Sequence, residues 1–176
     1  MPLNAPQKGV LAGMGIGAFA AIAILVAGTV FNPLSYAPQL DLGSRVAVAA
    51  QACLVLAIVL GVSIARLARH RFLTPEDIDG SSAGEGTRQA RILQSLVQNT
   101  LEQSLLAAMA YLAWAVLMPA HNLSVVPLAA IAFALGRVLF FAGYGKGARS
   151  RATGFALTFY PTLAMLLCVV AFTLWQ

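Results

Sequence analysis

The sequence predicts an all-α protein that is integral to a membrane, and three observations support this fold class. Hydrophobic residues make up 60% of the chain and charged residues only 10%, whereas about a quarter of a soluble globular chain is charged. The mean hydropathy is +0.82. Five apolar segments have about the 20 residues that a helix needs to cross a ~30 Å hydrocarbon core. These crossings and their connections use up the 176 residues, so we expect no separate soluble domain.

The first predicted span runs from Gly9 to Phe31 and contains no charged residue. It is too long for the apolar region of a secretory signal peptide, so we interpret it as a transmembrane helix. Small residues recur at every fourth position, at Gly9, Gly13, Gly17 and Ala21. This spacing puts them on one face of the helix, where a second helix can approach closely.

Four further spans are expected at residues 46–68, 88–118, 123–144 and 152–175. A proline-containing loop precedes the first of them. Before the next, Thr74-Pro75-Glu76-Asp77 is typical of a helix start, because threonine caps a helix and proline and acids suit its first turn. We expect a flexible linker over residues 80–86 and a short basic loop over residues 145–151.

The distribution of basic residues predicts the orientation in the membrane. Cytoplasmic connections are enriched in lysine and arginine. With a cytoplasmic N-terminus and an outside C-terminus, only Arg45 lies outside. Nine basic residues then lie inside: Lys8, Arg66, Arg69, Arg71, Arg88, Arg91, Lys146, Arg149 and Arg151. Since these residues mark topology, the net charge of +5 does not indicate nucleic-acid binding.

Two ionisable residues, Glu102 and Arg137, lie inside predicted spans. Such residues are costly in a bilayer and are candidates for function. Both lie at similar depth in the inner half of the membrane, so they are expected to face the bundle interior and could pair. Glu102 continues a polar stripe that has to face protein or water, formed with Arg91, Ser95, Gln98 and Asn99. A purely structural ion pair that fixes the helix register remains an alternative.

A similar face on the next span aligns Arg137, Phe140, Phe141 and Tyr144 above the basic loop. Together the two faces predict a cavity that is open to the cytoplasm, cationic at its mouth, polar inside, lined by aromatic residues and continuous with lipid. An anionic, partly polar ligand would suit it. Cys53 and Cys168 lie in apolar segments and predict no disulfide, and we expect no metal site.

Several short motifs occur in an order that resembles the MAPEG family, the membrane-associated proteins in eicosanoid and glutathione metabolism, and in particular its bacterial members. The motifs are Phe72-Leu-Thr-Pro-Glu-Asp77, Gln98-Asn-Thr-Leu-Glu-Gln103, Gly136-Arg137, Gly143-Tyr144 and Arg149-Ser-Arg151. The resemblance implies a four-helix MAPEG-like core over residues 46–176. Residues 1–45 would then be an extra N-terminal transmembrane helix with an outside loop.

The resemblance also implies a homotrimer that holds glutathione, as a co-substrate, between neighbouring subunits near the cytoplasmic face. Arg151 would lie beside the sulfur, a role that Arg149 could take instead. The residues expected to contact glutathione are Ser95, Gln98, Asn99, Glu102, Arg137 and Tyr144. The chain departs from the family where Ser95 replaces an arginine and Phe140 replaces a tyrosine.

Two functions follow from the resemblance. The first is a membrane-bound glutathione transferase or peroxidase that acts on lipophilic electrophiles reaching it through the bilayer. The alternative is a non-catalytic membrane protein that binds lipid or serves as a scaffold, since the family includes a member of that kind. Short loops suggest a bacterial inner membrane with the N-terminus in the cytoplasm.

Overall fold

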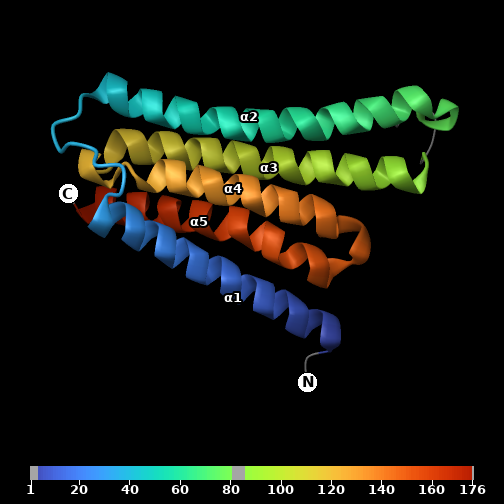
Figure 1. Cartoon of the computed structure of the whole chain (residues 1–176), viewed down its shortest axis with the longest axis horizontal. Helices are drawn as coiled ribbons and strands as arrows, with labels where there is room; N and C mark the ends of the chain where they lie inside the picture. Colours follow the sequence, from blue (N-terminus) through green and yellow to red (C-terminus); the bar gives the residue numbers. More distant parts are fainter. Residues whose placement is uncertain (1–3, 81–85, 176) are drawn as a thin grey trace.

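The computed structural model describes residues 4–80 and 86–175, and its regular elements there are all helical. Figure 1 shows the long helices lying roughly side by side. They are α1 (Ala5–Val26), α2 (Leu42–Leu73), α3 (Arg88–Leu117), α4 (Val125–Gly143) and α5 (Ala148–Trp175). Among the described residues, each of these five helices is long and apolar enough to cross a membrane when its adjoining turns are included. The predicted fold class is confirmed.

α1 begins earlier than the sequence predicted and ends as expected. Asn4 caps it, because its side chain accepts from the Gln7 backbone while Gln7 reaches back to the Asn4 backbone. The last turn, Ala27–Phe31, is a π-helix. Asn32 then adopts a left-handed conformation with a φ of 41°, and its side-chain oxygen accepts a hydrogen bond from Ser124 at 2.6 Å.

The chain between α2 and α3 differs from the prediction of a new helix at Thr74. Helical backbone geometry is disfavoured for a residue that precedes a proline. Thr74, which precedes Pro75, is extended, and α2 ends before it. A short 3-10 turn, Pro75–Asp77, follows, and Thr74 makes no side-chain capping bond. The helix-start motif therefore forms a turn that positions Asp77.

α5 starts earlier than predicted, which changes the setting of two candidate residues. A 3-10 turn, Tyr144–Lys146, follows α4, and Gly147 has a φ of 99°, which interrupts the helical path. The helix resumes at Ala148. The predicted basic loop over residues 145–151 is therefore wrong in part, because Arg149 and Arg151 belong to the first turn of α5.

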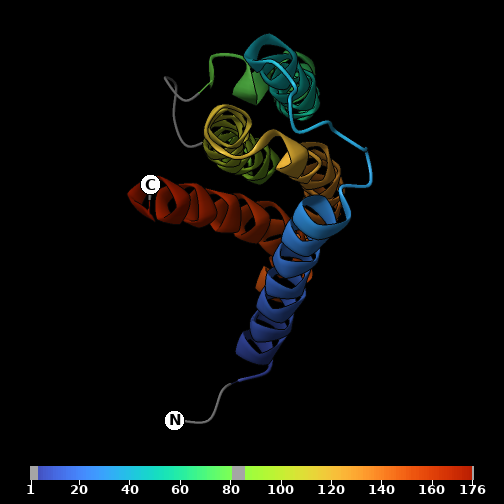
Figure 2. The same ribbon diagram turned by 90° about the vertical axis from the view of Figure 1, so that its left-hand side faces the viewer.

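The bundle is held together by different kinds of contact at its two sides. α2, α3 and α4 share an apolar core around Leu56, Trp114 and Phe133, while α1 packs mainly on α5. Figure 2 shows α1 on the side of the bundle opposite to α2. The small-residue face of α1 makes this contact, as predicted: a Cβ added at Gly17 would lie 2.5 Å from that of Ala156.

The predicted basic residues gather at one end of the bundle. α1, α3 and α5 begin there, and α2 and α4 end there (Figure 1). We call this the basic end. Arg45 lies in the first turn of α2, at the opposite end.

Candidate functional site

A cavity of about 450 Å³ opens among α1, α3, α4 and α5 towards the basic end. Three of the predicted site residues line it: Asn99, Tyr144 and Arg151. The remaining wall is mostly apolar and aromatic, and includes Phe140, Phe155, Phe159 and Tyr160. The predicted aromatic lining and a cation, Arg151, are therefore present, whereas the interior is mostly apolar and not polar as predicted.

The mouth of the cavity is built by the crossing of α4 and α5. A Cβ added at Gly143 would lie 2.2 Å from the Ser150 carbonyl oxygen, and one at Gly154 would lie 2.3 Å from the Phe140 nitrogen. These close approaches bring the Arg151 guanidinium over the Tyr144 ring, with its carbon 4.6 Å from the ring centroid. A cation held against an aromatic face beside a cavity is available to an anionic ligand.

Arg137 is completely buried beneath this cavity. Its two terminal nitrogens donate hydrogen bonds to the Asn99 side-chain oxygen at 2.9 Å and to the Thr158 hydroxyl at 3.0 Å. Its guanidinium carbon also lies 4.3 Å from the centroid of the Phe140 ring. Because arginine only donates hydrogen bonds, it fixes the Asn99 oxygen and leaves the Asn99 amide nitrogen free to donate to a ligand.

Glu102 and Arg137, which could pair according to the sequence, do not pair in the described structure, and a contact of Glu102 with a bound ligand stays a prediction. Glu102 is exposed on α3 and accepts a hydrogen bond from Gln98 at 2.9 Å. It follows Asn99 by three residues, which at 100° per residue rotates it about 60° away from the Asn99 side. Arg137 is thus partnered by neutral oxygens in the described structure.

The polar stripe on α3 is divided between two faces. Asn99 is half-buried and reaches the cavity, whereas Ser95 and Gln98 are exposed together with Glu102. The exposed residues follow alternating spacings of four and three along the helix, and the series continues through Leu105 and Met109. This outer face of α3 is uncovered within one chain.

Arg149 and Arg151 point to different sides of α5. They are two residues apart, which corresponds to about 200° around a helix. Arg149 packs against Gly9 of α1, where an added Cβ would lie 2.2 Å from the Arg149 side chain. It lines a separate hollow with Lys8 and Thr153, so it does not line the cavity.

Two cavity residues come from α1 and were not predicted as site residues. Val10 and Met14 line the cavity, each immediately after a glycine of the small-residue face. That glycine spacing predicted a close helix contact but could not identify α5 as the partner. Thr158 was also missed, because a lone threonine in an apolar helix carries no motif.

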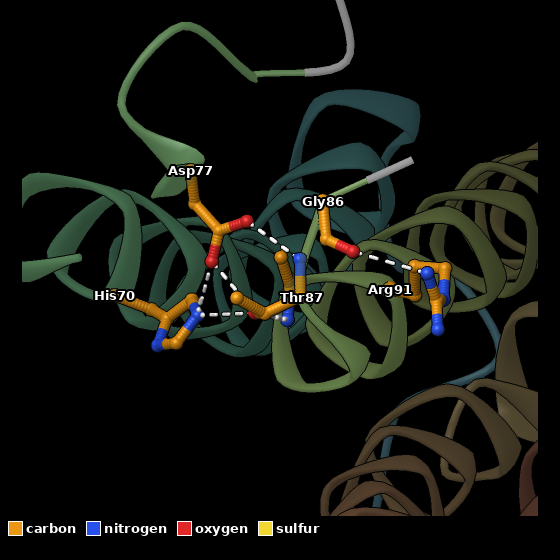
Figure 3. A network of polar contacts seen from close by, with 6 residues as sticks. His70, Asp77, Gly86, Thr87 and Arg91 are labelled. Carbon is orange, nitrogen blue, oxygen red and sulfur yellow. Dashed lines mark hydrogen bonds and ion pairs between the residues drawn. The ribbon is translucent and has the colours of Figure 1, made fainter. Parts of the chain in front are cut away.

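A polar network at the basic end fixes the start of α3 (Figure 3). The Asp77 carboxylate accepts hydrogen bonds from the Thr87 backbone at 2.7 Å and the Thr87 hydroxyl at 2.6 Å, and lies 2.9 Å from His70 Nε2. The Thr87 hydrogen bonds and the nearby His70 lower the pKa of this carboxyl. Arg91 donates to the Gly86 carbonyl at 3.0 Å. The network anchors the helix that carries Asn99.

Within residues 4–80 and 86–175, no group of three or more histidine, cysteine, aspartate or glutamate residues could hold a metal ion. Cys53 and Cys168 are both free thiols.

Comparison with known proteins gives one match. The family model of the MAPEG family matches residues 45–171, a range that includes α3, α4 and both walls of the α4–α5 crossing. No curated protein and no solved structure matches the chain. The match covers well over half of the sequence and agrees with the helical architecture, and we conclude that this chain belongs to the MAPEG family of membrane-associated proteins in eicosanoid and glutathione metabolism.

Proposed function

We propose that the protein is a membrane-bound glutathione transferase or peroxidase that acts on lipophilic electrophiles. The observation that carries this proposal is the Arg151 guanidinium, held against Tyr144 at the mouth of a cavity that Asn99 also lines. A thiol with a pKa of about 8.5 is mostly protonated at neutral pH. A guanidinium within ~4–6 Å favours the thiolate.

The chemistry needs only a thiolate and an electrophile. The glutathione thiol loses its proton to solvent, and the sulfur attacks an electrophilic carbon. A carbon–sulfur bond forms, and a leaving group departs with the electron pair. With a lipid hydroperoxide, the thiolate attacks the terminal oxygen, the O–O bond breaks, and the alkoxide takes a proton from solvent and leaves as the alcohol. A second glutathione then attacks the resulting sulfenic acid, which forms the disulfide and releases water.

The peptide part of glutathione would occupy the polar end of the cavity. Its two carboxylates suit arginine, and the Asn99 amide nitrogen can donate to it. Ser95, Gln98 and Glu102 could contact it only from an α3 face that another copy covers. A homotrimer with the site between subunits would bury that face. This favours the trimer, because a charged side chain such as that of Glu102 costs about 3 kcal/mol when it faces lipid.

The orientation of the protein in the membrane is part of the same proposal. With the basic end in the cytoplasm, the positive-inside rule is obeyed and the cavity opens to the compartment that contains glutathione. We propose a bacterial inner membrane with a cytoplasmic N-terminus.

Equilibrium binding of glutathione to the purified protein tests the proposal. The wild type should bind, Asn99→Ala should bind about tenfold or more weakly because it loses a charge-assisted contact, and Arg149→Gln should bind like the wild type. A wild type that binds no glutathione would refute the proposal.

A lipid-binding or scaffold function is the second candidate. The cavity lining is dominated by aromatic and aliphatic side chains, and Phe140 lacks the hydroxyl that the family's tyrosine would provide. Saturable binding of a fatty acid without any binding of glutathione would favour this function.

A further inference from the structure

α1 forms one wall of the cavity. Val10 and Met14 contribute to the lining together with Phe155 and Phe159 of α5. α1 packs on α5, and Figure 2 shows α1 on the side of the bundle away from α2. The matched family region begins at residue 45, so this wall comes from a part of the chain outside the match.

The wall is fixed in place by backbone contact. A Cβ added at Gly13 would lie 2.8 Å from the Thr153 nitrogen, and one at Gly17 would lie 2.8 Å from the Ala156 carbonyl oxygen. Contacts this close leave no room for α1 to slide inward without displacing backbone atoms. Val10 and Met14 therefore have a defined position relative to α5.

The cavity is chemically divided along α5. Arg151 and Tyr144 lie at its mouth, and the lining continues through Phe155 and Phe159 to Tyr160. Nine residues of helix separate Arg151 from Tyr160, which is about 14 Å at 1.5 Å per residue. An elongated ligand could thus place a reactive group near Arg151 and an apolar body between α1 and the aromatic rings of α5.

We propose that Val10 and Met14 form the wall of the subsite for the lipophilic co-substrate and determine which apolar bodies it accepts. The occupant is an elongated molecule with an aliphatic or aromatic body and an electrophilic end. The assignment of its reactive end rests on the proposed transferase function. Met14 suits this role because its flexible, polarisable side chain adapts to different apolar shapes, and it is 42% exposed.

The first test compares two electrophiles that differ only in the length of their alkyl chain. Met14→Trp should lower kcat/KM for the longer one by about tenfold or more relative to the shorter one, because the indole fills the subsite. Met14→Ala should shift the ratio the opposite way. Glutathione affinity should be unchanged in both variants. Ile22→Trp is the matched control, since Ile22 is 63% exposed on the same helix and is not part of the cavity lining.

A second test does not depend on turnover. The wild type, in bilayer discs, is irradiated with a photoreactive fatty acid, and the adducts are mapped by mass spectrometry. Saturable labelling of the segment containing Val10 and Met14 should be lost in Met14→Trp and kept in Ile22→Trp. A protein that binds no glutathione but shows this pattern would lose the transferase proposal and keep the α1 wall. Equal behaviour of the two tryptophan variants in both tests would overturn the inference.

Discussion

Arg137 is a fully buried cation whose hydrogen-bond partners are neutral. It donates to Asn99 and Thr158 and lies on the face of Phe140. Hydrogen bonds from a charged donor are stronger than neutral ones, and the aromatic face adds attraction. These contacts offset part of the desolvation cost and connect α3, α4 and α5 at one point below the cavity.

Removing this arginine should destabilise the protein through the oxygens that it leaves without a donor. We expect Arg137→Ala to lower the free energy of unfolding by roughly 2–4 kcal/mol. The double mutant with Asn99→Ala should deviate from additivity by about 0.5–3 kcal/mol, measured in mixed detergent micelles. Glu102→Ala should be additive with Arg137→Ala. Coupling to Glu102 instead of Asn99 would contradict the observed hydrogen bonding.

At this scale the sequence identified three polar residues of the cavity, but neither its apolar wall nor the hydrogen-bond partners of Arg137. The spacing of Arg137, Tyr144 and Arg151 and the family resemblance brought these residues to notice, and Asn99, Tyr144 and Arg151 meet in one cavity. Depth along two helices suggested a partner for Arg137. The partner depends on rotation about each helix axis, which a single sequence does not determine across helices.

At the scale of elements, α1 depends on glycine for its contact with α5. Gly13 and Gly17 approach α5 backbone atoms, whereas an added Cβ at Gly15 would meet nothing within 4 Å. Alanine normally stabilises a helix interior relative to glycine by about 0.5–1 kcal/mol. A glycine-to-alanine substitution should therefore lower the stability of the protein at Gly13 and leave it unchanged or raise it at Gly15.

Gly13→Ala should lower the Tm by roughly 2–12 °C, since overpacking costs about 1–3 kcal/mol. Gly15→Ala should leave the Tm unchanged or raise it slightly. Thermal unfolding followed by tryptophan fluorescence provides the measurement. Equal effects of the two variants would show that α1 is not packed through Gly13.

The connection between α2 and α3 makes stability depend on pH through Asp77. Its pKa is lower in the folded protein than in the unfolded chain. Its carboxylate therefore stabilises the fold above the unfolded pKa, and this contribution is lost as the pH falls through the folded pKa. Asp77→Asn should have a lower Tm than the wild type at pH 7, and the difference should shrink below about pH 4. A difference that persists unchanged in acid would exclude this role.

Element boundaries were predictable where a strong local signal exists. α3 starts at Arg88 as expected, and the π-helix that follows α1 ends at Phe31, where the first span was predicted to end. The start of α5 was misjudged because the basic residues 149–151 were interpreted as a loop, although Gly147 alone ends the preceding turn. Charge indicates which side of the membrane a segment faces, but does not determine whether it is helical.

At the scale of the whole molecule, the outer face of α3 is exposed in one chain. Leu105 and Met109 are 56% and 57% exposed and continue the line of Gln98 and Glu102. Residues at alternating spacings of three and four lie on one face of a helix, so these side chains form a continuous surface that a second copy can contact. The three-fold assembly implied by the family would cover this face.

Native mass spectrometry from detergent should therefore give the mass of three chains. Met109→Trp, which enlarges the proposed contact face, should shift the population towards monomer, whereas Ile22→Trp on α1 should not. A wild type that is monomeric at all accessible protein concentrations would contradict the assembly.

The central claim is that Arg151 stabilises a glutathione thiolate, and the ultraviolet absorbance of the thiolate tests it most directly. A guanidinium within ~4–6 Å of the sulfur should depress the thiol pKa by about 1–3 units. Glutathione bound at pH 7 should therefore be largely ionised. We predict a thiolate signal with the wild type and with Arg149→Gln, which is charge-matched to Arg151→Gln and lies off the cavity. Arg151→Gln should bind glutathione without the signal. Bound glutathione that shows no thiolate absorbance in the wild type would contradict the account.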